Sequence, residues 1–188
     1  MLKNLILIFM LISFITGFSQ TIVSTDAQNK KVIIEEFTGV ACIYCPIGHT
    51  IVQNLIDDNP GNVFAIKIHE GGYAQGYTPD FTTQWGTAIV SQSNNQGSYP
   101  SGTINRQVIS SASSNGGTSI ALGWNNINNN PFITAVEQVL LQSAYVNVGV
   151  EANLNVTTRE LIVHVEAYYT GDSPQSTNLL NIALLQNN

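Results

Sequence analysis

The chain has 188 residues, a formal net charge of −6 and only 10% charged residues. A chain of this length suits one full domain and part of another. It contains 6 Lys and Arg residues in all and no basic stripe, which argues against a nucleic-acid-binding surface. An acidic exported domain is the simpler interpretation of this composition.

The first residues have the three-part layout of a secretory signal peptide. Lys3 supplies a positive charge, an almost unbroken apolar run covers 5–15, and small residues follow at Gly17 and Ser19. The run is too short to span a bilayer, so we expect residues 1–19 to be removed on export. An uncleaved membrane anchor is the alternative. No later segment is long and apolar enough to cross a membrane, and we expect the chain in the periplasm, associated with the outer membrane, or at the cell surface.

The first part of the mature chain predicts a strand–helix–strand unit. Residues 32–38 form an apolar, strand-like run, and residues 46–58 carry apolar residues at helical spacing. A turn signal covers 59–62, and a second apolar strand covers 63–69. This order predicts two parallel strands joined by a right-handed crossover.

A polar segment, about 70–98, then reads as an insertion. Phe81, Trp85 and Ile89 recur every four residues, which predicts a helix over 80–91. Further along, the sequence predicts a short strand over 103–109, another over 119–122, and a helix that begins at Pro131. We expect residues 20–144 to make up one α/β domain.

From residue 145 onward the apolar residues follow the two-residue period of a strand, in place of the helical spacing before it. Apolar residues alternate with mostly polar ones over 146–156 and again over 161–169, with a turn between them. Residues 179–185 predict a third strand. We expect residues 145–188 to form the start of an antiparallel, sandwich-like β domain, and we expect a native protein that continues beyond Asn188.

The two cysteines of the chain, Cys42 and Cys45, lie between the first strand and the first helix. A Cys-x-x-Cys pair in that place is the layout of a thioredoxin-type redox site. The N-terminus of the helix favours the thiolate of Cys42, which would attack a disulfide, and Cys45 would then resolve the mixed disulfide. The alternative is an inert disulfide that fastens the start of the helix.

Two acids and two histidines lie near this pair. Glu35 and Glu36 point to opposite faces of a strand, and we expect Glu36 inside, where it could move the proton of Cys45. Two solvated acids are the alternative. His69 ends the second strand at the same sheet edge and could aid thiolate formation. We interpret His49 as a helix-surface residue. A zinc site built from the two cysteines and the two histidines is disfavoured, because the histidines do not have the spacing of a zinc finger and the cysteines are expected to be oxidised after export. We therefore expect no metal or cofactor.

Aromatic residues gather in or near the insertion. They could cover a groove beside the cysteines, but a satellite core, that is, a small separate hydrophobic core for the insertion, is the simpler interpretation. Tyr44, between the two cysteines, and Tyr99 are the expected substrate contacts. The aromatic residues in question are Tyr73, Tyr77, Phe81, Trp85 and Tyr99.

Residues 33–46, with Gly48 and His49 after them, resemble the twenty-eight-kilodalton outer-membrane-protein family of Bacteroidetes, whose members have a thioredoxin-like domain. Residues 99–106 look like the family's cis-proline strand, and the strands from Val146 onward look like the start of its β domain. The resemblance implies the nucleophile position for Cys42, the resolving position for Cys45 and the cis-proline position for Pro100. A cis bond there would turn Tyr99 toward the cysteines.

The chain departs from the thioredoxin pattern at two positions. Ala41 stands where a Trp commonly precedes the first cysteine, and Ile43 stands where Gly is common. Both departures affect substrate docking more than the fold. Two functions remain open: a thiol–disulfide oxidoreductase that acts on protein thiols or disulfides, and a non-enzymatic outer-membrane or surface binding protein that uses the fold as a scaffold.

Overall fold

The computed structural model describes residues 21–114, 116–123 and 130–185, so the expected signal peptide at 1–19 lies outside the described residues. The described chain divides into two compact units. One contains residues 29–143 with 179–185, and the other contains residues 21–28 with 144–178. The first unit has α/β architecture, and the second is a β-hairpin with the N-terminal segment beside it.

The sheet of the first unit has four strands in the order β2-β1-β3-β4. The central strand β1 (Val32–Thr38) pairs in parallel with β2 (Val63–His69), which confirms the predicted crossover. On its other side β1 pairs antiparallel with β3 (Ser101–Ile104), and β3 pairs antiparallel with the short β4 (Ile120–Ala121). The sheet is therefore mixed.

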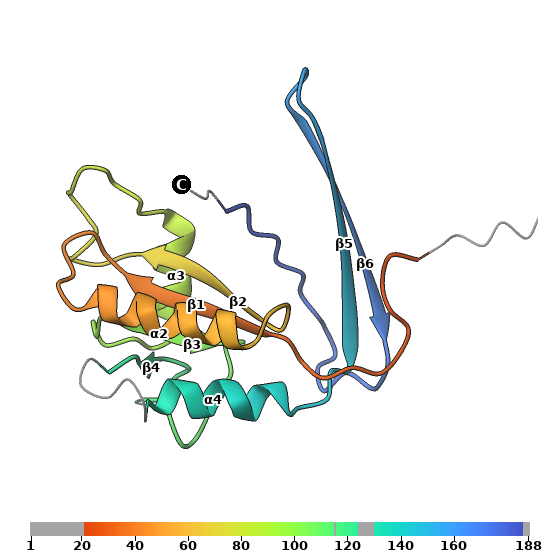
Figure 1. Ribbon diagram of the computed structural model, residues 1–188, viewed down its shortest axis with the longest axis horizontal. Helices are drawn as coiled ribbons and strands as arrows, with labels where there is room; N and C mark the ends of the chain where they lie inside the picture. The colour runs from red at the N-terminus through yellow and green to blue at the C-terminus, as the bar shows by residue number, and fades with distance from the viewer. Residues whose placement is uncertain (1–20, 115, 124–129, 186–188) are drawn as a thin grey trace, which may run out of the picture. The chain divides into compact units, whose positions relative to one another are not determined.

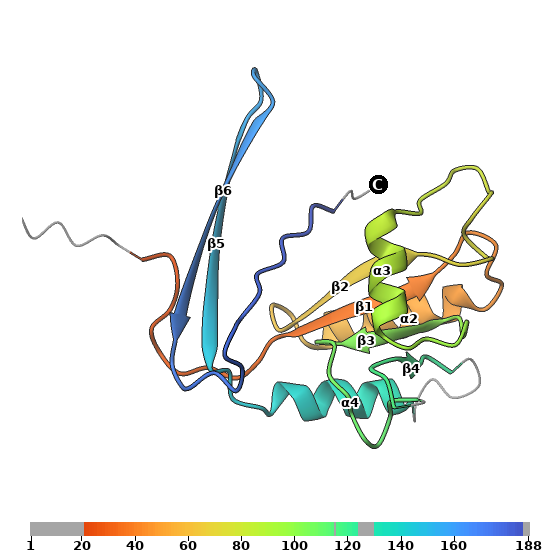
Figure 2. The same ribbon diagram turned by 180° about the vertical axis from the view of Figure 1, so that it is seen from behind.

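Helices cover both faces of this sheet. α2 (Cys45–Asp58) and α4 (Pro131–Leu140) lie on one face, in front of the sheet in Figure 1, and α3 (Gln84–Gln92) lies on the other, in front in Figure 2. Each helix buries one apolar stripe, as an amphipathic helix does. The largest core forms under α2 and α4, from β1 residues Val32 and Ile34 together with Ile51, Val52, Leu55, Val63, Ile104, Ile120, Leu122, Phe132, Ala135, Val136 and Val139.

The pleat of β1 decides which side chains meet which helix. Val32 and Ile34 point to the α2 and α4 side, whereas Phe37 packs with Ile68 and Val90 on the α3 side. Because side chains alternate along a strand, Glu36 and Thr38 face α2, and Glu35 faces the opposite side. The fold thereby directs one acid toward the helix that begins at the cysteines.

The predicted helix over 80–91 is present as α3, which begins at Gln84 and so leaves Phe81 outside it. Gly86 and Val90 are buried, whereas Trp85 is 72% exposed and Phe81 is 46% exposed. Trp85 therefore points to solvent, whereas Ile89 and Tyr99 pack against a small cluster of Phe37, Ile68 and Val90. The satellite core exists in part, without Trp85. The predicted strand over 103–109 is also shorter than expected, because the chain turns at Asn105 and Arg106, which both have positive φ.

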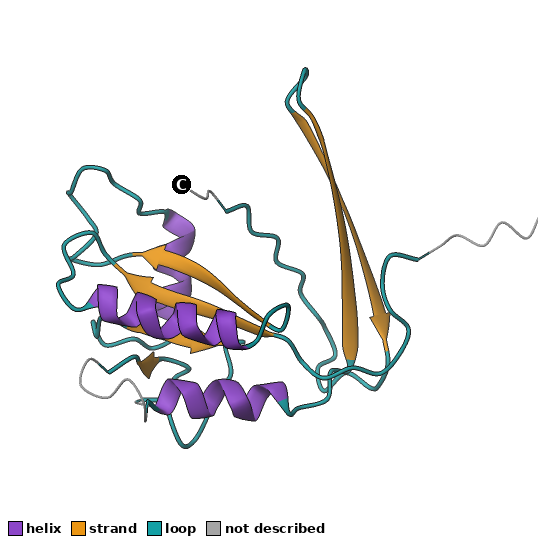
Figure 3. Ribbon diagram, viewed as in Figure 1, coloured by secondary structure: helices purple, strands orange, loops and turns teal. Residues whose placement is uncertain are grey.

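The second unit carries the long hairpin of β5 (Val146–Asn155) and β6 (Glu160–Tyr169), drawn in orange in Figure 3. All ten residues of each strand pair antiparallel, from Val146 with Tyr169 to Asn155 with Glu160, as the alternation predicts. The predicted third strand over 179–185 is wrong, since these residues form no ladder. Their apolar residues come as adjacent pairs, so the pattern does not fix one face or register.

Within the described part of the chain, no helix has both the length and the apolar character needed to cross a membrane.

Candidate redox site

The two cysteines form a disulfide at the entrance to α2, with their Cα atoms 5.4 Å apart. The turn before the helix brings them together: the amide of Cys42 donates to the carbonyl of Gly39, and the amide of Cys45 donates to the carbonyl of Cys42. Cys42 is 8% exposed and Cys45 is 1% exposed. Both cysteines are buried, and Cys42 is the less buried of the two.

The first turn of α2 carries no acidic side chain. The N-cap residue Tyr44 makes no side-chain capping hydrogen bond. Since the N-terminal N–H groups and the helix dipole favour a nearby negative charge, this arrangement favours the thiolate form of a reduced cysteine. Around the disulfide, Val40, Ile43 and Tyr44 are 42%, 85% and 50% exposed and form an apolar rim.

Two glycines allow close packing against this turn. A Cβ added to Gly39 would lie 2.5 Å from the backbone of Tyr73, whose carbonyl accepts a hydrogen bond from the amide of Ala41. A Cβ added to Gly48 would lie 2.8 Å from Cβ of Pro100. Pro100 is buried, follows a cis peptide bond and leads into β3. The sheet therefore holds Pro100 against the first turns of α2.

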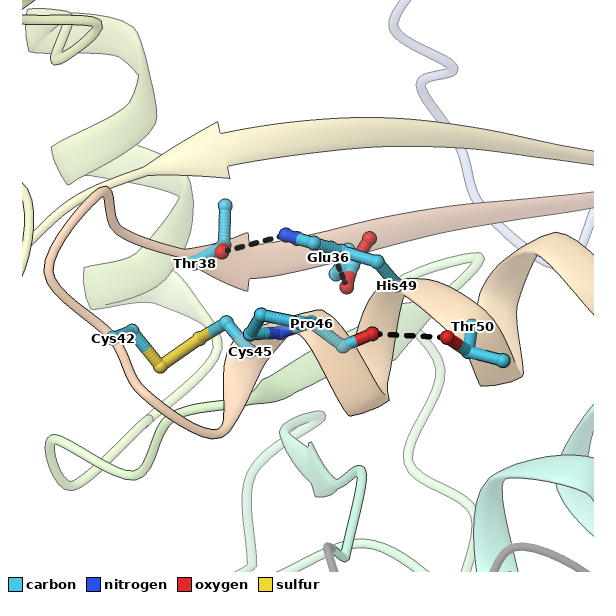
Figure 4. A network of polar contacts seen from close by, with 7 residues as sticks. All are labelled: Glu36, Thr38, Cys42, Cys45, Pro46, His49 and Thr50. Carbon is cyan, nitrogen blue, oxygen red and sulfur yellow. Dashed lines mark hydrogen bonds and ion pairs between the residues drawn. A yellow bond between two sulfur atoms is a disulfide. The ribbon is translucent and has the colours of Figure 1, made fainter.

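Glu36 is fully buried on the α2 side of β1, as the sequence predicts. Its Oε1 shares a hydrogen bond with Nδ1 of His49 at 2.6 Å, and Nε2 of His49 lies 3.4 Å from Oγ1 of Thr38 (Figure 4). Oε2 of Glu36 is buried and has no hydrogen-bond partner among the described residues. A carboxyl oxygen in this state retains an unused acceptor position beside the cysteine helix.

The interpretation of His49 as a plain surface residue was wrong, because its ring is half-buried against Glu36. Its position four residues after Cys45 was the available signal, since residues four apart share one face of a helix. Glu35 is not a solvated acid either. It is 5% exposed, accepts from Nε of Arg106 at 2.9 Å and from Oγ1 of Thr103 at 2.8 Å, and its hydrogen bond raises the pKa of Arg106.

His69 ends β2 on the same face as Glu36 and Thr38, as the register of the parallel pair requires. Burial lowers the pKa of His69 below 6.5, and the nearby His49 and Lys67 lower it further, against the opposing effect of Glu36. The imidazole is therefore neutral at neutral pH, so any help to a thiolate would come from a hydrogen bond and not from charge. Its Nδ1 is buried without a hydrogen-bond partner among the described residues, and its ring packs on Phe81.

Tyr99 contacts the segment that follows β2. Its hydroxyl donates to Oε2 of Glu70, and its ring meets Tyr73 edge to face at 5.9 Å. Burial, followed by the bond to Glu70, raises the pKa of Tyr99. These residues line a surface pocket of about 340 Å³ between the 70–73 segment and α3. The expectation that Tyr99 contacts substrate stays a prediction, and Glu70 as its partner was not foreseen.

The described residues contain no cluster of three or more His, Cys, Asp or Glu side chains with the geometry to hold a metal ion.

No protein-family model matches the sequence, and no curated protein matches it. The structure is similar to that of HBP35 of Porphyromonas gingivalis, with a TM-score of 0.47 and 20% identity over 67% of this chain. It is also similar to a crystallised protein of Agrobacterium tumefaciens, with a TM-score of 0.43 and 15% identity over 69% of this chain. The chain spans 38% and 54% of the lengths of these two proteins. Likenesses this distant carry no argument about function or family.

Proposed function

We propose that this chain is an exported thiol–disulfide oxidoreductase built on a thioredoxin-like fold. The observation that carries the proposal is the Cys42–Cys45 disulfide at the entrance to α2, with the buried carboxyl group of Glu36 on the side of the sheet that faces this helix. A fold alone would not support a reaction, but a cysteine pair at a helix N-terminus and a buried acid on the strand beside that helix do.

In the proposed reaction, the thiolate of reduced Cys42 attacks one sulfur of a substrate disulfide. A new Cys42–substrate disulfide forms and the other substrate sulfur leaves as a thiolate. Cys45 loses its proton and attacks Cys42, which closes the disulfide seen here and releases the second substrate thiolate. Two electrons pass from the protein dithiol to the substrate, so the step requires no cofactor. The reverse sequence would oxidise a substrate dithiol.

Substrate access runs past the apolar rim around Cys42. Val40, Ile43 and Tyr44 are exposed there, and an unfolded or extended protein segment could cover them while its disulfide approaches Cys42. Pro100, packed on Gly48, and Tyr99 beside it are the further proposed substrate contacts. His69 is the proposed modulator of the pair. The partners we propose are therefore protein thiols and disulfides, in the periplasm, at the outer membrane or at the cell surface.

A second candidate function is partner binding without catalysis. The observation that favours it is the apolar surface of the hairpin, where Val148, Val150, Leu154, Val156 and Ile162 are 54% to 82% exposed. Exposed apolar surface of this extent marks interaction sites in many proteins. In this case the α/β unit would serve as a scaffold and its disulfide would be structural. Membership of the Bacteroidetes family named above is compatible with either function and stays a proposal.

An insulin-reduction assay with dithiothreitol as the reductant tests the enzyme against the scaffold. We expect the wild-type protein to accelerate insulin reduction, Cys42→Ser to be inactive, and His164→Gln in the hairpin to match the wild type. Equal rates for wild type and Cys42→Ser would remove the enzyme and leave the binding function.

A further inference from the structure

We propose that His49 is a positioning residue that acts through Glu36 and carries the proton of Cys45 from the buried carboxyl group to solvent. The inference rests on the proposed exchange reaction and assigns a residue to its second step. It starts from a difficulty in the geometry: Glu36 is fully buried, so a proton that it takes from Cys45 needs a route out.

The contacts of Glu36 supply one such route. Oε1 lies 2.6 Å from Nδ1 of His49, while Oε2 has no hydrogen-bond partner among the described residues. The carboxyl group therefore presents one oxygen that can accept a proton and one that already shares a proton with the imidazole. The side chain of His49 is 32% exposed, so the ring reaches from the buried acid to water.

The other nitrogen of His49 is weakly held. Nε2 lies 3.4 Å from Oγ1 of Thr38, which is longer than an ordinary hydrogen bond of this kind. Water can therefore compete with Thr38 for this nitrogen, and the ring can exchange a proton there. An imidazole with one nitrogen on a carboxyl group and the other only weakly bonded is suited to pass a proton between that group and solvent.

Glu36, on β1, approaches the face of α2 that also contains Cys45. A Cβ on Gly48 would lie 3.3 Å from Oε1 of Glu36, and Gly48 follows Cys45 by three residues. Residues three apart lie on one face of a helix, so the carboxyl group faces the stripe that contains Cys45. Figure 4 shows the disulfide at the start of α2, His49 further along the same helix, and Glu36 on the neighbouring strand β1.

The proton balance of the step is complete. After Cys42 has formed the mixed disulfide, the thiol of Cys45 gives its proton to Oε2 of Glu36, and Oε1 gives the shared proton to Nδ1 of His49. Nε2 releases its proton to water. The Cys45 thiolate attacks the sulfur of Cys42, the Cys42–Cys45 bond forms, and the substrate sulfur leaves and takes a proton from water. Glu36 and His49 each end with one proton, as they began, but on Oε2 and Nδ1 in place of Oε1 and Nε2. Rotation of the carboxyl group and proton exchange between the imidazole and water restore the starting arrangement.

Few other charges act on His49. Glu36 faces it from β1, and His69, itself close to Lys67, faces it from β2. Burial first, then the nearby His49 and Lys67, lower the pKa of His69, against the opposing effect of Glu36. On α2 the acidic residues are at the far C-terminal end, eight or more residues from His49, or roughly 12 Å along the axis.

Stopped-flow reaction of the reduced protein with dithiobis(nitrobenzoate) separates the two steps. Attack by Cys42 releases the first thionitrobenzoate, and resolution by Cys45 releases the second. We expect His49→Gln to slow the second phase about 100-fold, the lower end of general acid–base effects, and to leave the first phase unchanged. The pH–rate profile of the second phase should lose its wild-type shape. His164→Gln, a histidine 59% exposed on the hairpin, should match the wild type in both phases.

His49→Ala gives a second, independent readout. Because the ring is partly exposed, its removal opens a path for free imidazole, which we expect to restore the second phase in proportion to its concentration. An unchanged second phase in His49→Gln, equal slowing of both phases, or no rescue by imidazole would overturn the role of His49. A wild-type protein that gives no second phase would instead overturn the proposed exchange reaction.

Discussion

Gly48 is the residue of α2 that packs closely against both Pro100 and Glu36, so Gly48→Ala tests the packing of the whole site. A Cβ at this position would lie 2.8 Å from Cβ and 3.2 Å from Cγ of Pro100, and 3.3 Å from Oε1 of Glu36. Pro100 is buried and its ring is rigid, so it cannot rotate away as a flexible side chain could. Either the helix or the strand that follows Pro100 must shift.

Two effects of opposite sign decide the outcome. Gly→Ala inside a helix normally stabilises it by about 0.8–1 kcal/mol. Forcing an extra carbon into a packed site costs about 1–3 kcal/mol. We therefore expect Gly48→Ala to lower the free energy of unfolding by about 1 kcal/mol, and to slow the exchange reaction because Pro100 and Glu36 both move. The matched control is Gly72→Ala, where an added Cβ meets nothing within 4 Å.

Urea unfolding of the oxidised proteins, followed by circular dichroism, measures both variants. Gly72→Ala should be unchanged or slightly more stable than the wild type, since it mainly restricts the unfolded chain. A Gly48→Ala protein that gains stability, as an ordinary helical glycine would allow, would refute the close approach of α2 to Pro100.

Three further predictions concern residues around the site. The pKa of His69 is lower in the folded protein than in the unfolded chain, so the unfolded chain binds a proton at this histidine at a higher pH. The free energy of unfolding should therefore hold above pH 6.5 and fall on acidification, and His69→Gln should reduce that fall in urea titrations at several pH values. An unchanged pH dependence in the variant would contradict the burial of the ring. Arg106→Ala leaves the buried Glu35 without its cation and should lower the free energy of unfolding by about 2 kcal/mol in the same titrations, with partial recovery in Arg106→Lys. A loss below about 0.5 kcal/mol would show that this ion pair does not stabilise the fold. Trp85→Ala should change the free energy of unfolding by no more than about 0.5 kcal/mol in urea titrations, because the indole is 72% exposed. A loss well above that would show that Trp85 packs in a core.

Much of the α/β unit could be predicted from local patterns. The apolar runs at 32–38 and 63–69 and the helical spacing between them specify the parallel pair and its crossover, because that connection has one allowed hand. The long alternation at 146–156 and 161–169 likewise specifies a hairpin with fixed register. These signals are local in sequence, and each is repeated over several residues.

The wrong predictions concern features that contacts between distant residues determine. Four-residue spacing marked the helix at Gln84–Gln92 but not all of its buried face, to which Gly86 contributes by packing its backbone close to Ile68. Pairs of adjacent leucines over 179–185 gave apolar character without the alternation that fixes a strand.

Within the site, the sequence could place Cys42, Cys45 and Glu36 on their elements. It could not show that His49 reaches Glu36 across the gap between helix and strand, because that contact joins residues from two elements. The same reason hid the pairing of Glu35 with Arg106, which are 71 residues apart in the chain.

Trapping of the mixed disulfide tests the central claim most directly. Reduced Cys45→Ser protein, mixed with a protein that contains an accessible disulfide, should form a covalent complex through Cys42 that non-reducing electrophoresis resolves and dithiothreitol removes. Reduced Cys42→Ser protein should form none under the same conditions, because Cys45 is 1% exposed. Equal yields from the two variants, or no complex from Cys45→Ser, would contradict Cys42 as the attacking sulfur and the exchange reaction built on it.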